Sequence, residues 1–571
     1  MEGMRSRWLP ALRDMLAQSS TTMAPRPRTP IMLVGNKIDL RGQMVQNLEL
    51  ERQMTPLMEE FKEVEMCIEC SAKANLNINE TFYFATQLVL YPTAPVYDST
   101  NKRMKDECVA ALRRIFKLSD KDKDGVLNDL ELNQFQARCF GAPLQPEELE
   151  GVKNVVRENI GDGITSDGLT CVGFLFLQHF FIQQGLLGTT WTVLRTFGYD
   201  NSLSLRSSFL SPEVPWSEDD TCMLTHKGYT FFANMFERSD LDNDGALNKA
   251  ELKDVFATCP NSAMPSQWAA NHFPTETTHT DSNGNVTLQG WLAQWSMTTL
   301  LDFRTTLRYL ALMGYEEDLI HAVCPVAHAS SLQHDCPRTM RGLVLGAPSS
   351  GKSTFLERYL GKSCTTATPQ VAKMVVNQVD GNQVPSSSSI YLVLEEANNA
   401  DEEQAALERL KQQNTGKVGQ QHHYDVVCFF FNGSGSIKRS GDDPSQPQKL
   451  FALHQRVLAG CAAAAIPCLH FITDVSSSSS SSGEEIRSLF EEKQLRYLPP
   501  PIPLSLKHDS LDQVFLQVAN EALNRKTSVY VPKAASSLRW GMIAAGGVVV
   551  AAIVAAAYAW RSHSASPKPS S

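Results

Sequence analysis

Hydrophobic positions along the chain change their period several times, and each change indicates a different kind of element. Short apolar runs at 31–34 and 66–70 flank a helical stretch and predict two strands of an α/β segment. Between residues 96 and 320 apolar residues recur mostly at helical spacing, which predicts a mainly helical region. Strand and helix patterns alternate again from 338 to 528. The pattern therefore predicts a multidomain protein of α/β plus α class.

The last apolar run of the chain has a different character. Residues 540–560 are uncharged and long enough to cross a bilayer as one helix. Aromatic residues lie at both ends of this run, and Arg539 and Arg561 flank it, as in helices that end at a membrane interface. We therefore expect a C-terminal transmembrane anchor, with a linker at 529–539 and a short basic tail at 561–571.

Composition and charge then bear on the partners and the compartment of the protein. The chain has 571 residues and a formal net charge of −10, which gives no electrostatic reason to expect nucleic acid as a partner. Its 13 cysteines are dispersed along the sequence, which is typical of a reducing compartment. The proline-rich stretch YPTAP at 91–95 indicates a boundary, so the N-terminal segment is expected to span 1–95.

Two acidic loops in the helical region follow the ligand template of a calcium-binding EF-hand. In each loop three aspartates alternate with other residues before a glycine, and a glutamate closes the loop. Carboxylate oxygens converge on one calcium ion only where the glycine lets the chain turn sharply. The predicted ligands are Asp120, Asp122, Asp124, Val126, Asn128 and Glu131 in the first loop, and Asp240, Asp242, Asp244, Ala246, Asn248 and Glu251 in the second. Degenerate copies that begin at Asp162 and Asp281 lack a complete ligand set and are expected to pair with the hands without metal.

A phosphate-binding loop opens the second α/β segment. The sequence GAPSSGKS at 346–353 has the Walker A spacing, with an apolar strand before it and a helix after it. The backbone N–H groups would cradle phosphates, Lys352 would reach the β- and γ-phosphates, and Ser353 would bind Mg²⁺. The predicted nucleotide contacts are Gly346, Ser350, Gly351, Lys352, Ser353 and Thr354.

The remaining parts of this nucleotide site give weaker signals. The candidates for a mobile sensor of the γ-phosphate are Thr365, Thr366 and Thr368. Either Glu395 or Glu396 is a candidate for the acidic residue near Mg²⁺. Asp474 and the stretch 505–507 match the guanine-reading motifs only in part. Nucleotide binding with moderate guanine preference and slow hydrolysis is the resulting prediction, and no catalytic residue is assigned.

The N-terminal segment holds its own pair of guanine-reading motifs, each after a predicted strand. Their residues are Asn36, Lys37 and Asp39 in the first motif and Ser71, Ala72 and Lys73 in the second. A carboxylate can accept two parallel hydrogen bonds from the N–H edge of guanine, which adenine does not offer. The sequence before them contains no phosphate loop, so the segment corresponds to the second half of a GTPase-like domain. It is either an incomplete gene product or a relic that folds without nucleotide, and we favour the first.

The order of these parts resembles the mitochondrial Rho GTPases of the Miro family. The resemblance extends from Trp8 onward, is tight through the EF-hand region and is loose in the second GTPase-like domain. The stretches that carry it include VGNKIDL, ECSAK, IFKLSDKDKDGVLNDLELNQFQ and LDNDGALNKAEL. It implies P-loop GTPase-like, doubly wound domains on either side of a helical EF-hand region, with GTP or GDP, Mg²⁺ and Ca²⁺ as ligands. It also implies an outer mitochondrial membrane protein that faces the cytosol, binds motor adaptor proteins and regulates mitochondrial trafficking, morphology and inheritance.

Two functional interpretations follow from this sequence. The first is a calcium-binding, nucleotide-dependent switch GTPase that hydrolyses GTP slowly. The alternative is a catalytically inactive, calcium-responsive tether whose GTPase-like domains only bind partners. The complete phosphate loop favours the first, whereas the missing switch glycine and the absent first phosphate loop favour the second.

Overall fold

The computed structural model describes most of the chain and divides it into two compact units. The described residues are 2–18, 29–40, 47–61, 63–217, 220–326, 337–346, 350–362, 371–379, 389–413, 423–432, 446–473, 501–506 and 510–523. The first unit comprises Met1–Val214, Asn234–Met264 and Arg304–Ile320, and the second comprises Pro215–Ala233, Pro265–Phe303 and His321–Ser571. The calcium loops belong to the first unit and a six-stranded sheet belongs to the second.

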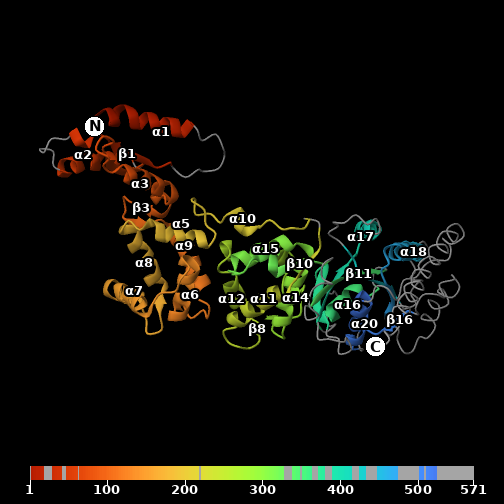
Figure 1. Cartoon of the computed structure of the whole chain (residues 1–571). Coiled ribbons are helices and arrows are strands. Elements are labelled where there is room, and N and C mark those ends of the chain that lie inside the picture. The colour runs from red at the N-terminus through yellow and green to blue at the C-terminus, as the bar shows by residue number, and fades with distance from the viewer. Residues whose placement is uncertain are drawn as a thin grey trace, which may run out of the picture. The chain divides into compact units, whose positions relative to one another are not determined.

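The N-terminal segment of the first unit is a small α/β arrangement (Figure 1). Its elements are η1 (Met4–Trp8), α1 (Leu9–Gln18), β1 (Ile31–Gly35), η2 (Ile38–Leu40), α2 (Asn47–Glu60), β2 (Val64–Glu69) and α3 (Ile78–Leu90). The strands β1 and β2 pair in parallel, with α2 between them in the chain, because parallel neighbours need a crossover connection. Leu9, Leu57, Phe61 and Val64 form the buried core beneath them. The two strands predicted from the apolar runs are therefore confirmed.

The region that follows is mainly helical, as predicted. The elements of the first hand and its partner are α4 (Thr93–Val96), β3 (Tyr97–Asp98), β4 (Arg103–Met104), α5 (Asp106–Ser119), β5 (Val126–Leu127), α6 (Asp129–Phe140), α7 (Pro146–Asn159), η3 (Gly161–Gly163), β6 (Leu169–Thr170), α8 (Cys171–Gln183), α9 (Leu187–Thr196) and α10 (Ser207–Leu210). The second hand and its surroundings comprise β7 (Cys222–Leu224), α11 (His226–Ser239), β8 (Ala246–Leu247), α12 (Lys249–Val255), η4 (Pro260–Ser262), α13 (Ser266–Ala270), β9 (Val286–Thr287), α14 (Leu288–Leu301), α15 (Phe303–Leu312), η5 (Leu319–Ala322) and β10 (Val323–Pro325).

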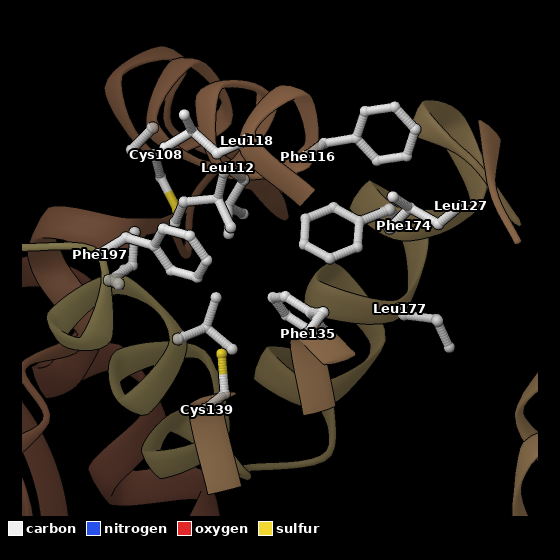
Figure 2. Packing of buried hydrophobic residues seen from close by; sticks show 14 of the residues in the cluster. Cys108, Leu112, Phe116, Leu118, Leu127, Phe135, Cys139, Phe174, Leu177 and Phe197 are labelled. Atoms are coloured by element: carbon white, nitrogen blue, oxygen red, sulfur yellow. The ribbon is translucent and has the colours of Figure 1, made fainter. Parts of the chain in front are cut away.

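The first hand and its degenerate partner share one apolar core. Phe135 lies at its centre, edge-on to Phe174 with ring centroids 5.4 Å apart and stacked on Phe197 at 6.3 Å. Figure 2 shows these rings facing one another from α6, α8 and the end of α9, below Leu112 of α5. The short strands β5 and β6 pair in antiparallel fashion and join the calcium loop to its partner loop. The degenerate copy at Asp162 thus completes the fold of the first hand, as expected.

The second unit contains a doubly wound α/β sheet. Its elements are β11 (Arg338–Gly346), α16 (Lys352–Tyr359), β12 (Met374–Val379), β13 (Ile390–Glu396), α17 (Ala400–Gln413), β14 (Val426–Asn432), α18 (Gln446–Ala464), β15 (Cys468–Thr473), β16 (Ile502–Leu504) and α20 (Asp512–Leu523). The strand order is β12-β13-β11-β14-β15-β16, and only the β12–β13 pair is antiparallel. This confirms the predicted α/β class of the segment.

Helices cover both faces of this sheet, as the alternation along β14 demonstrates. Val426, Cys428 and Phe430 lie in one apolar core with residues of α16 and α20. Residues 427, 429 and 431 of the same strand lie in the opposite core with α17 and α18. Because successive side chains of a strand point to opposite faces, each face needs its own layer of helices. The phosphate loop therefore begins at the end of a central strand buried on both sides.

The outer edge of β12 is occupied by the segment before α14, which belongs to the same unit. The backbone N–H of Val376 donates to the carbonyl of Thr277 at 2.9 Å, and that of Ala372 donates to the carbonyl of Glu276 at 2.9 Å. The Gln289 amide on α14 donates to Asn377 Oδ1 at 2.7 Å. An edge strand with unsatisfied backbone groups would invite non-native pairing, and these contacts occupy part of that edge.

Among the described residues, no helix is long and apolar enough to span a membrane. The predicted linker at 529–539, the predicted anchor at 540–560 and the predicted basic tail at 561–571 lie outside the described residues.

Candidate functional site

The phosphate loop lies between the end of β11 and the start of α16. Gly346 has a φ of +148°, and a Cβ there would lie 2.3 Å from the Phe430 carbonyl oxygen. Gly351 has a φ of +84°, and a Cβ there would lie 2.5 Å from a methyl carbon of Leu506. Both positions therefore require glycine, for backbone conformation and for space. The stretch 347–349 of the predicted loop lies outside the described residues.

Lys352 is the first residue of α16, and its side chain turns back toward the loop. The ammonium Nζ donates to the Gly346 carbonyl at 2.9 Å, and the residue is only 5% exposed. Burial lowers the pKa of Lys352, an effect that the nearby carboxylates of Glu396 and Glu403 oppose. A buried ammonium at the start of a helix is suited to phosphate oxygens, whose negative charge it would meet in a site of low dielectric.

Ser353 and Glu396 form a hydrogen-bonded pair of oxygen-bearing side chains beside the phosphate loop. The Ser353 hydroxyl donates to Glu396 Oε1 at 2.8 Å, and the carboxylate is 2% exposed. Burial raises the pKa of Glu396, although the Ser353 hydrogen bond and Lys352 act in the opposite direction. Hydroxyl and carboxylate oxygens are the ligands that Mg²⁺ prefers, so this pair fits the ion. Of the two glutamates that the sequence left open, Glu396 is the one beside Ser353, and Thr354 follows in the first turn of α16.

Glu395 points into a buried polar network that no sequence motif indicates. Its carboxylate accepts from Arg341 at 2.6 Å, from the Tyr424 hydroxyl at 2.9 Å and from Arg409 at 3.1 Å. Burial acts to raise the pKa of Glu395, but the two arginines and Tyr424 outweigh it and hold the pKa below its usual value. The network joins β11, β13 and α17 behind the phosphate loop. An arginine inside the apolar run of β11 was the available sequence signal.

The base-reading side of this site is only partly described. The Thr473 hydroxyl at the end of β15 donates to the Ser350 carbonyl at 2.8 Å, which ties this strand to the phosphate loop. Leu506, in the stretch predicted to contact the base, lies beside Gly351. The remaining candidates, Asp474, Lys507, Thr365, Thr366 and Thr368, lie outside the described residues.

The structure brings together the two guanine-reading motifs of the N-terminal segment. Asn36 Oδ1 accepts from the backbone N–H of Ala72 at 3.4 Å, and the Ser71 hydroxyl donates to Asp39 Oδ1 at 2.5 Å. Lys37 has a φ of +64°, the left-handed conformation in which the loop turns after β1. Asn36, Asp39 and Ala72 remain exposed, and Lys73 is exposed beside them. The carboxylate of Asp39 is therefore available at the surface with its orienting hydroxyl in place.

In the first calcium loop the three aspartates converge. Oxygens of Asp120, Asp122 and Asp124 lie within 4.8 Å of one another. Glu131 folds over the loop and accepts from the Lys121 backbone N–H at 2.6 Å. Burial raises the pKa of Asp120 to about 6, and repulsion from Glu131 and Asp124 adds to the effect. Carboxylates held this close without a cation repel one another, so the donor set fits Ca²⁺.

The second calcium loop repeats this geometry. Oxygens of Asp240, Asp242 and Asp244 also lie within 4.8 Å of one another. Glu251 accepts from the Leu241 backbone N–H at 3.0 Å and, through its other oxygen, from that of Asn248 at 3.0 Å. Gly125 and Gly245 have φ values of +87° and +84°, so each loop turns at its glycine. The carbonyl positions, Val126 and Ala246, begin β5 and β8, and Asn128 and Asn248 cap the helices α6 and α12.

The loop that begins at Asp281 uses its carboxylate within its own turn. Asp281 Oδ1 accepts from the backbone N–H groups of Asn283 at 2.8 Å and Asn285 at 2.7 Å. In the described part of the chain, carboxylates cluster at metal-binding spacing only in the two predicted loops.

Comparisons with known proteins extend these observations. A model described as Ras family matches residues 8–91, and two models described as EF hand associated match residues 142–228 and 268–333. Mitochondrial Rho GTPase 1 of Emericella nidulans is 34% identical over 581 residues, which cover 98% of this chain and 84% of that protein. Proteins of the same name from Mycosarcoma maydis and Cryptococcus neoformans var. neoformans are 40% and 44% identical, over 75% and 58% of this chain.

The chain spans only part of some of these relatives. The matched region covers 63% of the Mycosarcoma maydis protein and 54% of the Cryptococcus neoformans var. neoformans protein. The Emericella nidulans match nevertheless runs through nearly all of this chain, including both GTPase-like segments and both calcium loops. The chain therefore belongs to the mitochondrial Rho GTPase family.

Proposed function

We propose that the chain is a calcium-binding, nucleotide-dependent switch GTPase, and that its second unit holds the working phosphate site. The observation that carries this proposal is the arrangement of Lys352, Ser353 and Glu396 around the phosphate loop. A buried ammonium and a hydroxyl–carboxylate pair meet at the end of a central strand and the start of a helix. The family name of the relatives supports GTP hydrolysis as the reaction.

Each residue of this site has a defined task in the proposal. Lys352 binds the β- and γ-phosphate oxygens, and Ser353 and Glu396 hold Mg²⁺, directly or through water. The ion, when bound, neutralises the charge that develops on the transferred phosphoryl group. Glu395, fixed by Arg341, holds the end of β13 in the position that directs Glu396 toward Ser353. We assign no residue to the orientation of the attacking water, and we therefore expect slow turnover.

In this proposal the switch responds to calcium as well as to nucleotide. Both loops carry the full predicted ligand set and the required turn at glycine, which supports calcium binding. We further propose that the predicted segment 540–560 anchors the chain in the outer mitochondrial membrane, with the bulk facing the cytosol. Motor adaptor proteins of the cytoskeletal transport machinery are the proposed partners, in mitochondrial trafficking, morphology and inheritance.

One experiment separates this proposal from a catalytically inactive tether. Purified chain is denatured, and the released nucleotide is identified and quantified by chromatography. The proposal expects bound nucleotide at close to one equivalent per chain after purification in Mg²⁺, and loss of it after treatment with a chelator of Mg²⁺. Chain that folds normally, retains no nucleotide and takes up none when GTP is added with Mg²⁺ would instead support the tether.

A further inference from the structure

Two lysines alternate with the aspartates of the first calcium loop. Lys121 and Lys123 occupy the positions between Asp120, Asp122 and Asp124. Both ammonium groups contact residues of the second-hand region rather than their own loop. All of these residues belong to the first compact unit. The two lysines contact different residues, so they are expected to have different effects on the second calcium loop.

Lys123 reaches both ends of the second calcium loop. Its Nζ lies 2.9 Å from Asp254 Oδ2 and 2.9 Å from the Ser239 hydroxyl oxygen. Ser239 directly precedes Asp240, the first predicted ligand of the second loop, and Asp254 lies on α12, the helix that carries the closing ligand Glu251. One ammonium therefore joins the middle of the first loop to the helices that enter and leave the second.

Lys121 makes a matched contact that bypasses the second loop. Its Nζ lies 2.7 Å from Glu316 Oε1, which also accepts from Arg138 at 3.5 Å. Glu316 follows α15 and belongs to neither calcium loop. The two lysines thus place the same charge beside the same aspartates, but only Lys123 touches the flanks of the second loop. This difference makes Lys121 a natural control.

We propose that Lys123 couples the two calcium loops energetically, so that calcium in one loop strengthens binding in the other. The inference rests on the proposed calcium binding. Lys123 has a φ of +59° and lies between two ligands, so drawing Asp122 and Asp124 onto one ion moves and then fixes the backbone that carries it. The ammonium, already held against Ser239 and Asp254, transmits that ordering to the second loop. Thermodynamic linkage requires that calcium in either loop raises the calcium affinity of the other loop by the same factor.

The expected coupling is modest because the bridge is partly exposed. The Lys123 side chain is 21% exposed and the Asp254 side chain is 50% exposed. Ion pairs of this kind change an equilibrium by a factor of about two to five. A factor of that size is measurable when the affinity of each loop is determined separately.

Calorimetric calcium titrations of the detergent-solubilised full chain test the coupling. Glu251→Gln isolates the first loop, Glu131→Gln isolates the second, and the native chain gives the overall constant for two ions. The coupling factor is the overall association constant divided by the product of the two single-loop constants. We expect a factor of about two to five in the native chain and in Lys121→Met, and a factor of one in Lys123→Met.

Asp254→Asn breaks the same bridge from its other end and should also give a factor of one. Changes in single-loop affinity caused by the lost charge cancel in the ratio. A factor of one in the native chain, or an unchanged factor in Lys123→Met and Asp254→Asn, would overturn the coupling while leaving calcium binding intact. Absence of calcium binding in the native chain would overturn the calcium assignment itself and the coupling with it.

Discussion

Replacement of Arg341 by methionine should strongly destabilise the sheet of the second unit. Arg341 and Glu395 form an ion pair of 2.6 Å whose side chains are 4% and 5% exposed. Removing one partner of such a buried pair costs about 3–5 kcal/mol, because the other charge stays buried without its counter-ion. Tyr424 and Arg409 still bond to Glu395, so we expect the lower end, about 3 kcal/mol. A loss of this size lowers the melting temperature of a domain of this length by about 6–12 °C.

Lys373→Met is the matched control for this prediction. Lys373 pairs with Glu402 at 3.1 Å in the same unit, but the side chains are 43% and 28% exposed. Exposed pairs of this kind contribute below about 1 kcal/mol, since water screens them. Denaturant-dependent hydrogen exchange of peptides from β11 and β13 would measure both variants within the full chain. Destabilisation by Arg341→Met no greater than by Lys373→Met would refute the argument for a buried ion pair.

A second change, Glu395→Gln in the Arg341→Met background, tests the reason for the loss. The proposed cause is the buried charge of Glu395, which Arg409 alone compensates only in part, rather than a missing contact. Glutamine keeps the shape of the side chain and removes the charge, so the double variant should regain part of the lost stability. No recovery would mean that the arginine stabilises the sheet through packing on Tyr424, whose ring centroid lies 5.0 Å from the guanidinium.

Three further predictions concern other parts of the structure. Glu131→Gln and Glu251→Gln should each lower the calcium stoichiometry in calorimetric titrations by one ion. Each native loop is expected to bind calcium with a dissociation constant of about 10⁻⁷–10⁻⁵ M. Unchanged stoichiometry would contradict the ligand assignment. Burial lowers the pKa of His454 to about 4, so the unfolded state binds a proton at a higher pH than the folded state does. The free energy of unfolding therefore falls as the pH drops below the ordinary histidine pKa, by about 2 kcal/mol near pH 5. His454→Phe should reduce this acid sensitivity in denaturant titrations, and an unchanged pH profile would contradict the prediction. Truncation after Val531 should release the chain from mitochondria in fractionation experiments, and a truncated chain that still sediments with them would point to another attachment.

Local sequence was sufficient to predict most of the helices, the strands and the ligand loops. The calcium loops could be predicted because every ligand lies within one short stretch, and the glycine and the helix-capping asparagine are fixed by the same stretch. The strand, loop and helix around Lys352 were predictable for the same reason. Apolar runs were sufficient to place β1, β2 and β11, since strands of a parallel sheet carry apolar residues on both faces.

Features that depend on contacts between distant parts of the chain could not be predicted from the sequence. Glu395 and Glu396 point to opposite faces of β13, but only the packed sheet shows which face meets Ser353. The contact between Lys123 and Asp254 joins residues 131 positions apart, and no local pattern predicts such a pair. The docking of the segment before α14 on β12 is a backbone contact, which side-chain patterns do not report.

We propose that the phosphate loop of the second unit binds nucleotide through Lys352. Titration of the Lys352→Ala chain with fluorescent GTP and ATP analogues in Mg²⁺ tests it most directly. Affinity should fall about tenfold to a hundredfold, because a charge-assisted contact of about 1.5–3 kcal/mol is lost. The native chain should bind with a strong dependence on the triphosphate and a weaker preference between the two bases. Equal affinities of the native and Lys352→Ala chains would contradict this role of Lys352, as would a native chain that binds neither analogue.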